Sequence, residues 1–150
     1  RARAQRLNIH PSLSTIVCIP AFELSTKKAR AVLPELVPLA DAVYNSSRAL
    51  LLTRTLESGH VSRLPELMKD RLHQPYRAKL VPGLEDAMAA ALETGACGAA
   101  LSGSGPTVLA FVEGRNASVG SAMTRAFAKH GVTSRWLALP VDHQGVRVER

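Results

Sequence analysis

The stretch that decides the fold is GAALSGSGPTVLAFV, residues 98–112. Its two apolar runs, GAAL and TVLAFV, are separated by the polar turn SGSGP at residues 102–106. Short apolar runs around a glycine-rich turn predict a β-hairpin. Glycines also let a backbone approach a phosphate closely, so a phosphate-facing loop is the alternative. The pattern alone favours the plain turn, because the stretch lacks a P-loop lysine and does not open a helix.

The segments on either side of the hairpin alternate between strand and helix patterns. The β-branched run LSTIVCIP predicts a first strand over residues 13–20, and TSRWLALP predicts a last strand over residues 133–140. Apolar spacing, capping residues and proline or glycine stops predict helices over residues 25–33, 35–57, 61–72, 82–95 and 117–131. This order predicts an α+β fold of the ferredoxin-like split βαβ type, with extra helices in the first crossover. Its antiparallel four-stranded sheet would have helices on one face.

Two of the predicted helices have distinct sequence signals. In residues 35–57 the apolar positions recur at near-helical spacing: Leu36, Leu39, Val43 and Leu50. Gly59 follows as a C-terminal stop. Residues 82–95 begin with proline and end with glycine, and their apolar face consists of Leu84, Met88, Ala91 and Leu92.

Residues 1–150 are expected to form a single domain, because the sequence contains no linker and no internal repeat. Cys18 and Cys97 lie in apolar segments, so we expect free thiols rather than a disulfide or a metal site. No apolar run approaches the roughly 20 residues that span a bilayer. The first ten residues also lack the apolar core of a secretory signal. We therefore expect a cytoplasmic protein without a membrane partner. Its arginine start suggests a processed product or a piece of a longer chain.

The formal net charge of +7 raises the question of a nucleic-acid partner. The nineteen lysines and arginines are scattered, and aromatic residues make up only 4% of the chain. Single-strand binding usually relies on aromatic side chains that stack with bases. We therefore expect no nucleic-acid partner, and a small anion or an acidic partner segment explains the charge better.

Thr26 and Arg30 are candidate ligand-binding residues. They lie four residues apart on the helix predicted over residues 25–33, so their side chains share a face. A hydroxyl and a guanidinium side by side suit a carboxylate or a phosphate. On the residues alone, a capping threonine and a solvated arginine are favoured over a binding site.

The segment DRLHQPYR, residues 70–77, is the densest polar cluster of the chain. Pro75 is expected to force an extended path on the residue before it, and polar residues on a constrained loop are often functional. His73 has no acid–base partner close in sequence, so we expect a structural or surface histidine without a catalytic role. The chain shows no acidic pair for magnesium, no P-loop and no nucleophile motif. We therefore expect neither catalytic residues nor metal ligands in it.

Four segments occur in the order and at the intervals typical of the homoserine kinases, a family of GHMP small-molecule kinases. They are FELSTKKARAVLP, DAVYNSSRALLL, MKDRLHQPYRAKLVPGL and GACGAALSGSGPTVLAFV. The LSGSGPT motif alone indicates only the GHMP superfamily, whereas DRLHQPYR followed by PGL is far more specific. The chain resembles the C-terminal domain of this family from about Leu13 to the closing GVRV.

The resemblance implies a substrate and a set of site residues. The substrate anchors of the family match Thr26, Arg30 and Arg77. The turn that packs behind the family's phosphate loop matches Gly103, Ser104 and Gly105. The arginines would hold the α-carboxylate of L-homoserine, and the turn would support the phosphate site through its backbone.

The family's main phosphate loop and its acidic residues near magnesium belong to an N-terminal half that residues 1–150 do not contain. The resemblance therefore implies the C-terminal domain of a longer, homodimeric enzyme of threonine biosynthesis. ATP and Mg²⁺ would be bound mainly by the N-terminal half, and the chain alone would be inactive.

Three alternatives remain at this stage. Another GHMP kinase would act on a mevalonate-pathway alcohol or a sugar, and a neutral sugar would have no carboxylate for Arg30 and Arg77. A ferredoxin-like regulatory domain would bind an amino acid without any nucleotide, which leaves DRLHQPYR unexplained. An RNA-binding domain would need aromatic side chains on its sheet.

Overall fold

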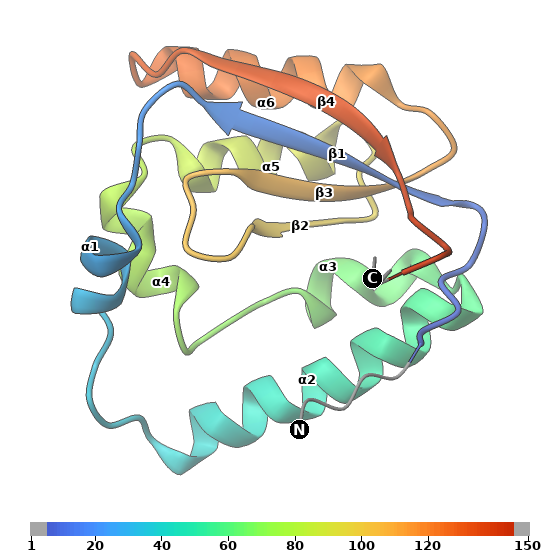
Figure 1. Ribbon diagram of the computed structural model, residues 1–150, viewed down its shortest axis with the longest axis horizontal. Coiled ribbons are helices and arrows are strands. Elements are labelled where there is room, and N and C mark those ends of the chain that lie inside the picture. The colour runs from blue at the N-terminus through green and yellow to red at the C-terminus, as the bar shows by residue number, and fades with distance from the viewer. Residues whose placement is uncertain (1–5, 146–150) are drawn as a thin grey trace, which may run out of the picture.

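The structure is a computed structural model that describes residues 6–145 (Figure 1). The strands are β1 (Leu13–Pro20), β2 (Gly98–Leu101), β3 (Val108–Glu113) and β4 (Ser134–Pro140). The α-helices are α1 (Thr26–Ala31), α2 (Leu39–Ser58), α3 (Leu64–Leu67), α4 (Gln74–Arg77), α5 (Leu84–Glu93) and α6 (Ala117–Lys129). Two short 3₁₀ helices are η1 (Val61–Arg63) and η2 (Ala78–Leu80).

The four strands form one antiparallel sheet in the order β2-β3-β1-β4. Ile16 at the centre of β1 pairs with Ala110 of β3 on one side and with Ala138 of β4 on the other. This order and the βαββαβ succession confirm the predicted ferredoxin-like fold. The predicted hairpin is also present, with β2 and β3 joined by residues 102–107.

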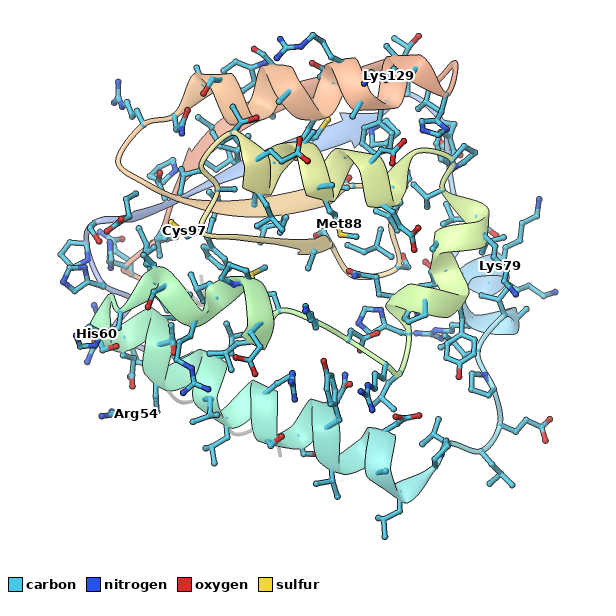
Figure 2. All side chains as sticks on the ribbon, turned by 180° about the vertical axis from the view of Figure 1, so that it is seen from behind. Arg54, His60, Lys79, Met88, Cys97 and Lys129 are labelled. Atoms are coloured by element: carbon cyan, nitrogen blue, oxygen red, sulfur yellow. The ribbon has the colours of Figure 1, made fainter. Side chains whose placement is uncertain are left out.

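Helices α5 and α6 cover one face of the sheet and enclose the core (Figure 1). The largest fully buried side chains there include Phe127, Ile16 and Leu84. Met88 of α5 packs against this core from the helix side (Figure 2). Gly120 of α6 faces the ring of Trp136, so that the helix lies close to β4. Among residues 6–145, no helix is long and apolar enough to cross a membrane.

Helices α2 and α3 lie beyond the free edge of β2, on the side away from β3 (Figure 1). The contact is close at Gly98 of β2, where an added Cβ would lie 2.5 Å from Sδ of Met68 and 3.1 Å from Cβ of Leu64. Successive residues of a strand point to opposite faces of the sheet, and paired residues share a face. Ala110 faces the core beneath α5 and α6, whereas Gly98 pairs with the next residue, Phe111. Helix α3 therefore contacts the opposite face of the sheet.

The apolar stripe of α2, defined here as Leu39, Val43 and Leu50 of the helix together with Leu36 in the segment before it, lies on the outside of the molecule. Its side chains are 58–88% exposed. The near-helical spacing predicted the helix but not its orientation, because the opposite face of α2 carries the polar side chains that contact residues 70–71. An amphipathic helix of a lone domain normally turns its apolar face inward.

Residues 61–72 do not form the single helix that the sequence predicted. The structure has the 3₁₀ turn η1, one turn of α3 and then an irregular segment. Pro75 does not force an extended path either, since it lies in the first turn of α4, where a missing N–H is no loss. Asp70 accepts hydrogen bonds from the amides of His73 and Gln74, so that a new helical turn begins after it.

Cys18 and Cys97 are free thiols, as predicted. Cys18 is buried in the core, and burial raises the pKa of its thiol despite the hydrogen bond with Ser134. Cys97 is partly exposed just before β2, and burial followed by the nearby Glu113 carboxylate raises the pKa of its thiol. Both shifts disfavour the reactive thiolate form.

Candidate functional site

Three segments that are far apart in the sequence meet at one end of the sheet: α1, α4 and the turn between β2 and β3 (Figure 1). Helix α1 follows the end of β1. Because β1 and β3 are antiparallel, the end of β1 lies beside the start of β3, where the turn ends. The sheet therefore fixes where α1 and the turn lie relative to each other.

The turn at residues 102–107 is a tight, hydrogen-bonded loop. The amide of Ser102 donates to the carbonyl of Thr107 over 2.8 Å, and the amide of Gly105 donates to the carbonyl of Ser102 over 3.0 Å. Gly103 has φ of 57° and Gly105 has φ of 84°, both in the left-handed region that favours glycine. Ser104 lies between them. The turn itself therefore requires glycine at both positions.

Arg77 joins the three segments through its guanidinium group. Its Nε donates to the carbonyl of Ala29 in α1 over 3.0 Å, and its Nη1 donates to the carbonyl of Gly103 in the turn over 2.8 Å. Nη1 also lies 3.4 Å from Nδ1 of His73. Among the residues described, Nη2 has no acceptor and the guanidinium has no carboxylate within 4.0 Å. A half-buried cation of this kind can still bind an anion.

Helix α1 presents Thr26 and Arg30 to solvent beside this junction. Its N-cap is Ser25, whose Oγ accepts a hydrogen bond from the amide of Lys28, so Thr26 does not have the capping role that the residues alone favoured. Within residues 6–145, Arg30 has no carboxylate partner. A polar side chain and a guanidinium are thus available on α1 for a ligand.

A cavity of about 630 Å³ lies between α1 and the turn. Residues 19–26 and Lys28 form one wall, and Pro106 and Thr107 form the other. Thr26 is the predicted anchor that lines it, whereas Arg30 and Arg77 lie outside its lining. Thr26 therefore lines the same cavity as the end of the turn, and Arg77 contacts the turn through a direct hydrogen bond.

Helix α4 is held from both sides by side chains to which the sequence assigned no individual role. Oδ2 of Asp70 accepts hydrogen bonds from the amides of His73 over 2.8 Å and Gln74 over 2.5 Å. Oδ1 of Asp70 accepts from Nδ2 of Asn45 in α2 over 2.5 Å. Oε1 of Gln74 accepts from the amide of Leu101 at the end of β2 over 2.7 Å. These bonds link α2, α4 and β2.

The hydrogen bonds of Asp70 also set its ionisation. Burial would raise the pKa of this carboxyl, but the amides of Gln74 and His73, the Asn45 side chain and the nearby His73 ring together lower it below the ordinary value of 3.8. Its side chain is 10% exposed, and Nε2 of His73 lies 3.6 Å from Oδ1. Asp70 is therefore an ionised hydrogen-bond acceptor at neutral pH.

Part of this arrangement was visible in the sequence. An aspartate three and four residues before the amides it caps, followed by a proline in the first turn, is a helix-start signal. The roles of Asn45 and Gln74 had no local signal, because Asn45 lies 25 residues from Asp70 and Leu101 lies 27 residues from Gln74.

The described residues do not offer a metal site. Among residues 6–145, no group of three or more His, Cys, Asp or Glu side chains could hold a metal ion. The site instead has cationic and hydroxyl side chains beside a glycine turn. Such a set suits the binding of a carboxylate or phosphate rather than of a cation.

The family described as GHMP kinases C terminal matches residues 51–129 of the chain. The homoserine kinase of Moorella thermoacetica is 49% identical over 144 residues, which are 95% of this chain and 48% of that protein. The homoserine kinase of Desulfitobacterium hafniense is 46% identical over 146 residues, or 97% of this chain and 49% of that protein. The chain therefore spans about half the length of the curated relatives it matches.

Solved structures of GHMP-type kinases also match the fold of the chain. The crystal structure of homoserine kinase from Cytophaga hutchinsonii matches with a TM-score of 0.87 and 31% identity, over 93% of this chain and 45% of that one. The L. major mevalonate kinase in complex with R-mevalonate matches with a TM-score of 0.57 and 18% identity, over 89% of this chain and 44% of that one. The second similarity concerns the fold alone.

Proposed function

Because the chain belongs to the family of GHMP kinase C-terminal domains, we propose that it is the substrate-side domain of a longer homoserine kinase. That enzyme transfers the γ-phosphate of ATP to the hydroxyl of L-homoserine and yields ADP and O-phospho-L-homoserine, a step towards threonine. The relatives named homoserine kinase, which align with nearly the whole chain, support this substrate.

One observation carries the proposal: Arg30 and Arg77, whose guanidinium groups have no carboxylate partner among residues 6–145, lie on the segments that meet the turn at residues 102–107. The fork of an arginine matches a planar carboxylate, and L-homoserine has one. The two arginines would hold the α-carboxylate, and Thr26 would contribute a hydroxyl from α1.

Binding of the carboxylate by the two arginines would determine where the rest of the substrate lies. The hydroxyl, at the other end of homoserine, then points towards the phosphate site, which the backbone of Gly103, Ser104 and Gly105 supports from behind. In the transfer, the hydroxyl oxygen bonds to the γ-phosphorus while the bond from that phosphorus to ADP breaks, and catalysis is mostly positioning and charge stabilisation. We assign neither a catalytic base nor a metal ligand to this chain.

ATP and Mg²⁺ are, in this proposal, bound mainly by an N-terminal domain that precedes these residues in the longer enzyme. A cytoplasmic homodimer completes the proposal. The exposed apolar stripe of α2 supports a partner surface, because large exposed apolar patches on soluble domains usually mark contacts with other chains or domains.

Release of ADP by the purified longer protein, with Mg²⁺, ATP and one candidate substrate at a time, tests the proposal. We expect turnover with L-homoserine and none with galactose or mevalonate. The isolated 150-residue chain is expected to be inactive. A preference for galactose or mevalonate would contradict the substrate, and turnover by the pure isolated chain would contradict the division into two halves.

A further inference from the structure

Resting on the proposed function, we propose that Asp70 and Gln74 are positioning residues that aim Arg77 at the substrate carboxylate. Neither side chain would touch the substrate. Asp70 holds the first turn of α4, Gln74 fastens that turn to the end of β2, and Arg77 follows three residues later at the end of α4.

Helix α4 needs outside support because it has only four residues. A first helical turn fixes several backbone dihedrals for a single hydrogen bond, so a one-turn helix is unfavourable by itself. The residue at its N-cap, His73, makes no side-chain capping bond. Asp70 takes that role with a single oxygen, which accepts from the amides of both His73 and Gln74.

The carboxylate of Asp70 is itself fixed from the opposite side. Nδ2 of Asn45 donates to its other oxygen, while Oδ1 of Asn45 accepts from the amide of Arg71 over 3.0 Å. Both oxygens of Asp70 are therefore occupied, and the start of α4 is connected to the long helix α2. An acceptor with partners on both oxygens cannot rotate without breaking bonds.

Gln74 determines how far α4 lies from the turn. Strand β2 pairs only with β3 in the described sheet, so the amide of Leu101 faces the free edge, where Gln74 accepts from it. Ser102, the next residue, begins the turn that ends at Thr107. A shift of Gln74 would therefore move α4 relative to the carbonyl of Gly103 that Arg77 contacts.

Arg77 can then present one defined edge. Its Nε and Nη1 are occupied by the carbonyls of Ala29 and Gly103, which leaves Nη2 as the group without an acceptor among residues 6–145. A long, flexible side chain is thereby held in a single orientation before the substrate arrives. Pre-organised anchors of this kind improve both binding and the geometry of transfer.

The test compares two substrates in the longer enzyme: L-homoserine and 3-aminopropan-1-ol, which is homoserine without its carboxylate. The measured quantity is kcat/KM for L-homoserine divided by kcat/KM for 3-aminopropan-1-ol. A variant that merely lowers the amount of folded enzyme lowers both values equally and leaves the ratio unchanged. We expect D70N and Gln74→Met to reduce the ratio about tenfold or more, as expected for a weakened charge-assisted hydrogen bond.

Two further variants act as controls. In D70N the new amide would face the amide of Asn45, whereas the exchange N45D with D70N restores a donor opposite an acceptor, so it should recover most of the ratio. D41N removes a carboxylate that contacts the same segment at Arg71, 3.1 Å away, and should leave the ratio unchanged.

The outcomes separate the two proposals. If the wild-type enzyme does not use L-homoserine, the proposed function fails. If it does, and both D70N and Gln74→Met keep the wild-type ratio, the positioning role is wrong. Should D70N fail to fold, Gln74→Met alone decides: a reduced ratio supports the role, and an unchanged ratio overturns it.

Discussion

Arg77 is the residue on which the candidate site depends most. Its guanidinium contacts a carbonyl of α1 and a carbonyl of the turn at the same time, over 3.0 and 2.8 Å. The fork of arginine can reach two acceptors and still keep one N–H edge for a ligand. Lysine has a single ammonium group and cannot reproduce this geometry, so arginine and lysine are not equivalent at this position.

We predict that Arg77→Ala lowers kcat/KM for L-homoserine by about 10–150-fold in the longer enzyme, the equivalent of one charged hydrogen bond of ~1.5–3 kcal/mol. Arg77→Lys should recover only part of this loss. Steady-state kinetics measures the change, with Arg125→Ala, an exposed arginine on α6, as the matched control. A wild-type kcat/KM for Arg77→Ala would show that Arg77 does not bind the substrate.

Asp70 should make the protein sensitive to acid. Its pKa in the folded state lies below the ordinary value of 3.8, so the ionised carboxylate stabilises the fold above 3.8. This contribution is lost as the pH falls through the folded-state pKa, where the carboxylate becomes protonated. Thermal unfolding at neutral pH and in this acidic range measures it.

D70N serves as the reference for that measurement. The variant should unfold more easily than the wild type at neutral pH, and the difference should shrink as the pH falls through the folded-state pKa of Asp70. A difference that stays constant down to that range would show that the charge of Asp70 does not contribute to stability.

Among the elements, α6 and β4 were the easiest to predict and α4 was the hardest. The sequence predicts a helix over residues 117–131, and the buried side chains of α6 repeat at helical spacing: Val119, Ala122, Met123, Ala126 and Phe127. Helix α4 is held by donors from α2 and β2, Asn45 and the amide of Leu101, which lie more than twenty residues away, so the local helix-start signal at Asp70 did not indicate what holds it. The same reason explains why α2 was predicted as a helix while its orientation was not.

The contact between α6 and β4 predicts a steric effect at Gly120. A Cβ built there would lie 2.5 Å from Cγ and 2.7 Å from Cε3 of the Trp136 ring. We expect Gly120→Ala to destabilise the fold by about 1–3 kcal/mol through overpacking, although alanine is the better helix former. Denaturant unfolding measures this loss.

Two companion variants identify the cause. Gly120→Ala combined with Trp136→Leu should be more stable than Gly120→Ala alone, because the smaller side chain leaves room for the methyl group. Ser121→Ala, at the next position of α6, should change the stability by less than about 0.5 kcal/mol. If Gly120→Ala were as stable as the wild type, the close packing of α6 on Trp136 would be wrong.

At the scale of the whole molecule, the chain spans about half the length of the curated relatives it matches. The fold, the hairpin turn and the family were all predictable from the sequence, because the strand order follows from local patterns and the motifs are specific. The proposed substrate anchors lie at one end of the sheet, and the apolar stripe of α2 lies on the outside. A surface of this kind favours association when nothing covers it.

We predict that the isolated chain self-associates through the apolar stripe of α2. Leu39 and Leu50 are 79% and 69% exposed, so Leu39→Glu with Leu50→Glu should lower the apparent mass in size-exclusion chromatography with light scattering. Leu92→Glu, at a 38% exposed leucine on α5, is the control and should have no effect. Equal association of all three proteins would show that the stripe does not cause it.

The most direct test of the central claim is a crystal structure of the longer protein with L-homoserine bound. We predict that the substrate carboxylate lies within hydrogen-bond distance, about 3 Å, of the guanidinium groups of both Arg30 and Arg77. Its hydroxyl should point towards the side of the turn at residues 102–107. A carboxylate bound elsewhere, with neither arginine in contact, would contradict the assignment of this chain as the substrate-side domain.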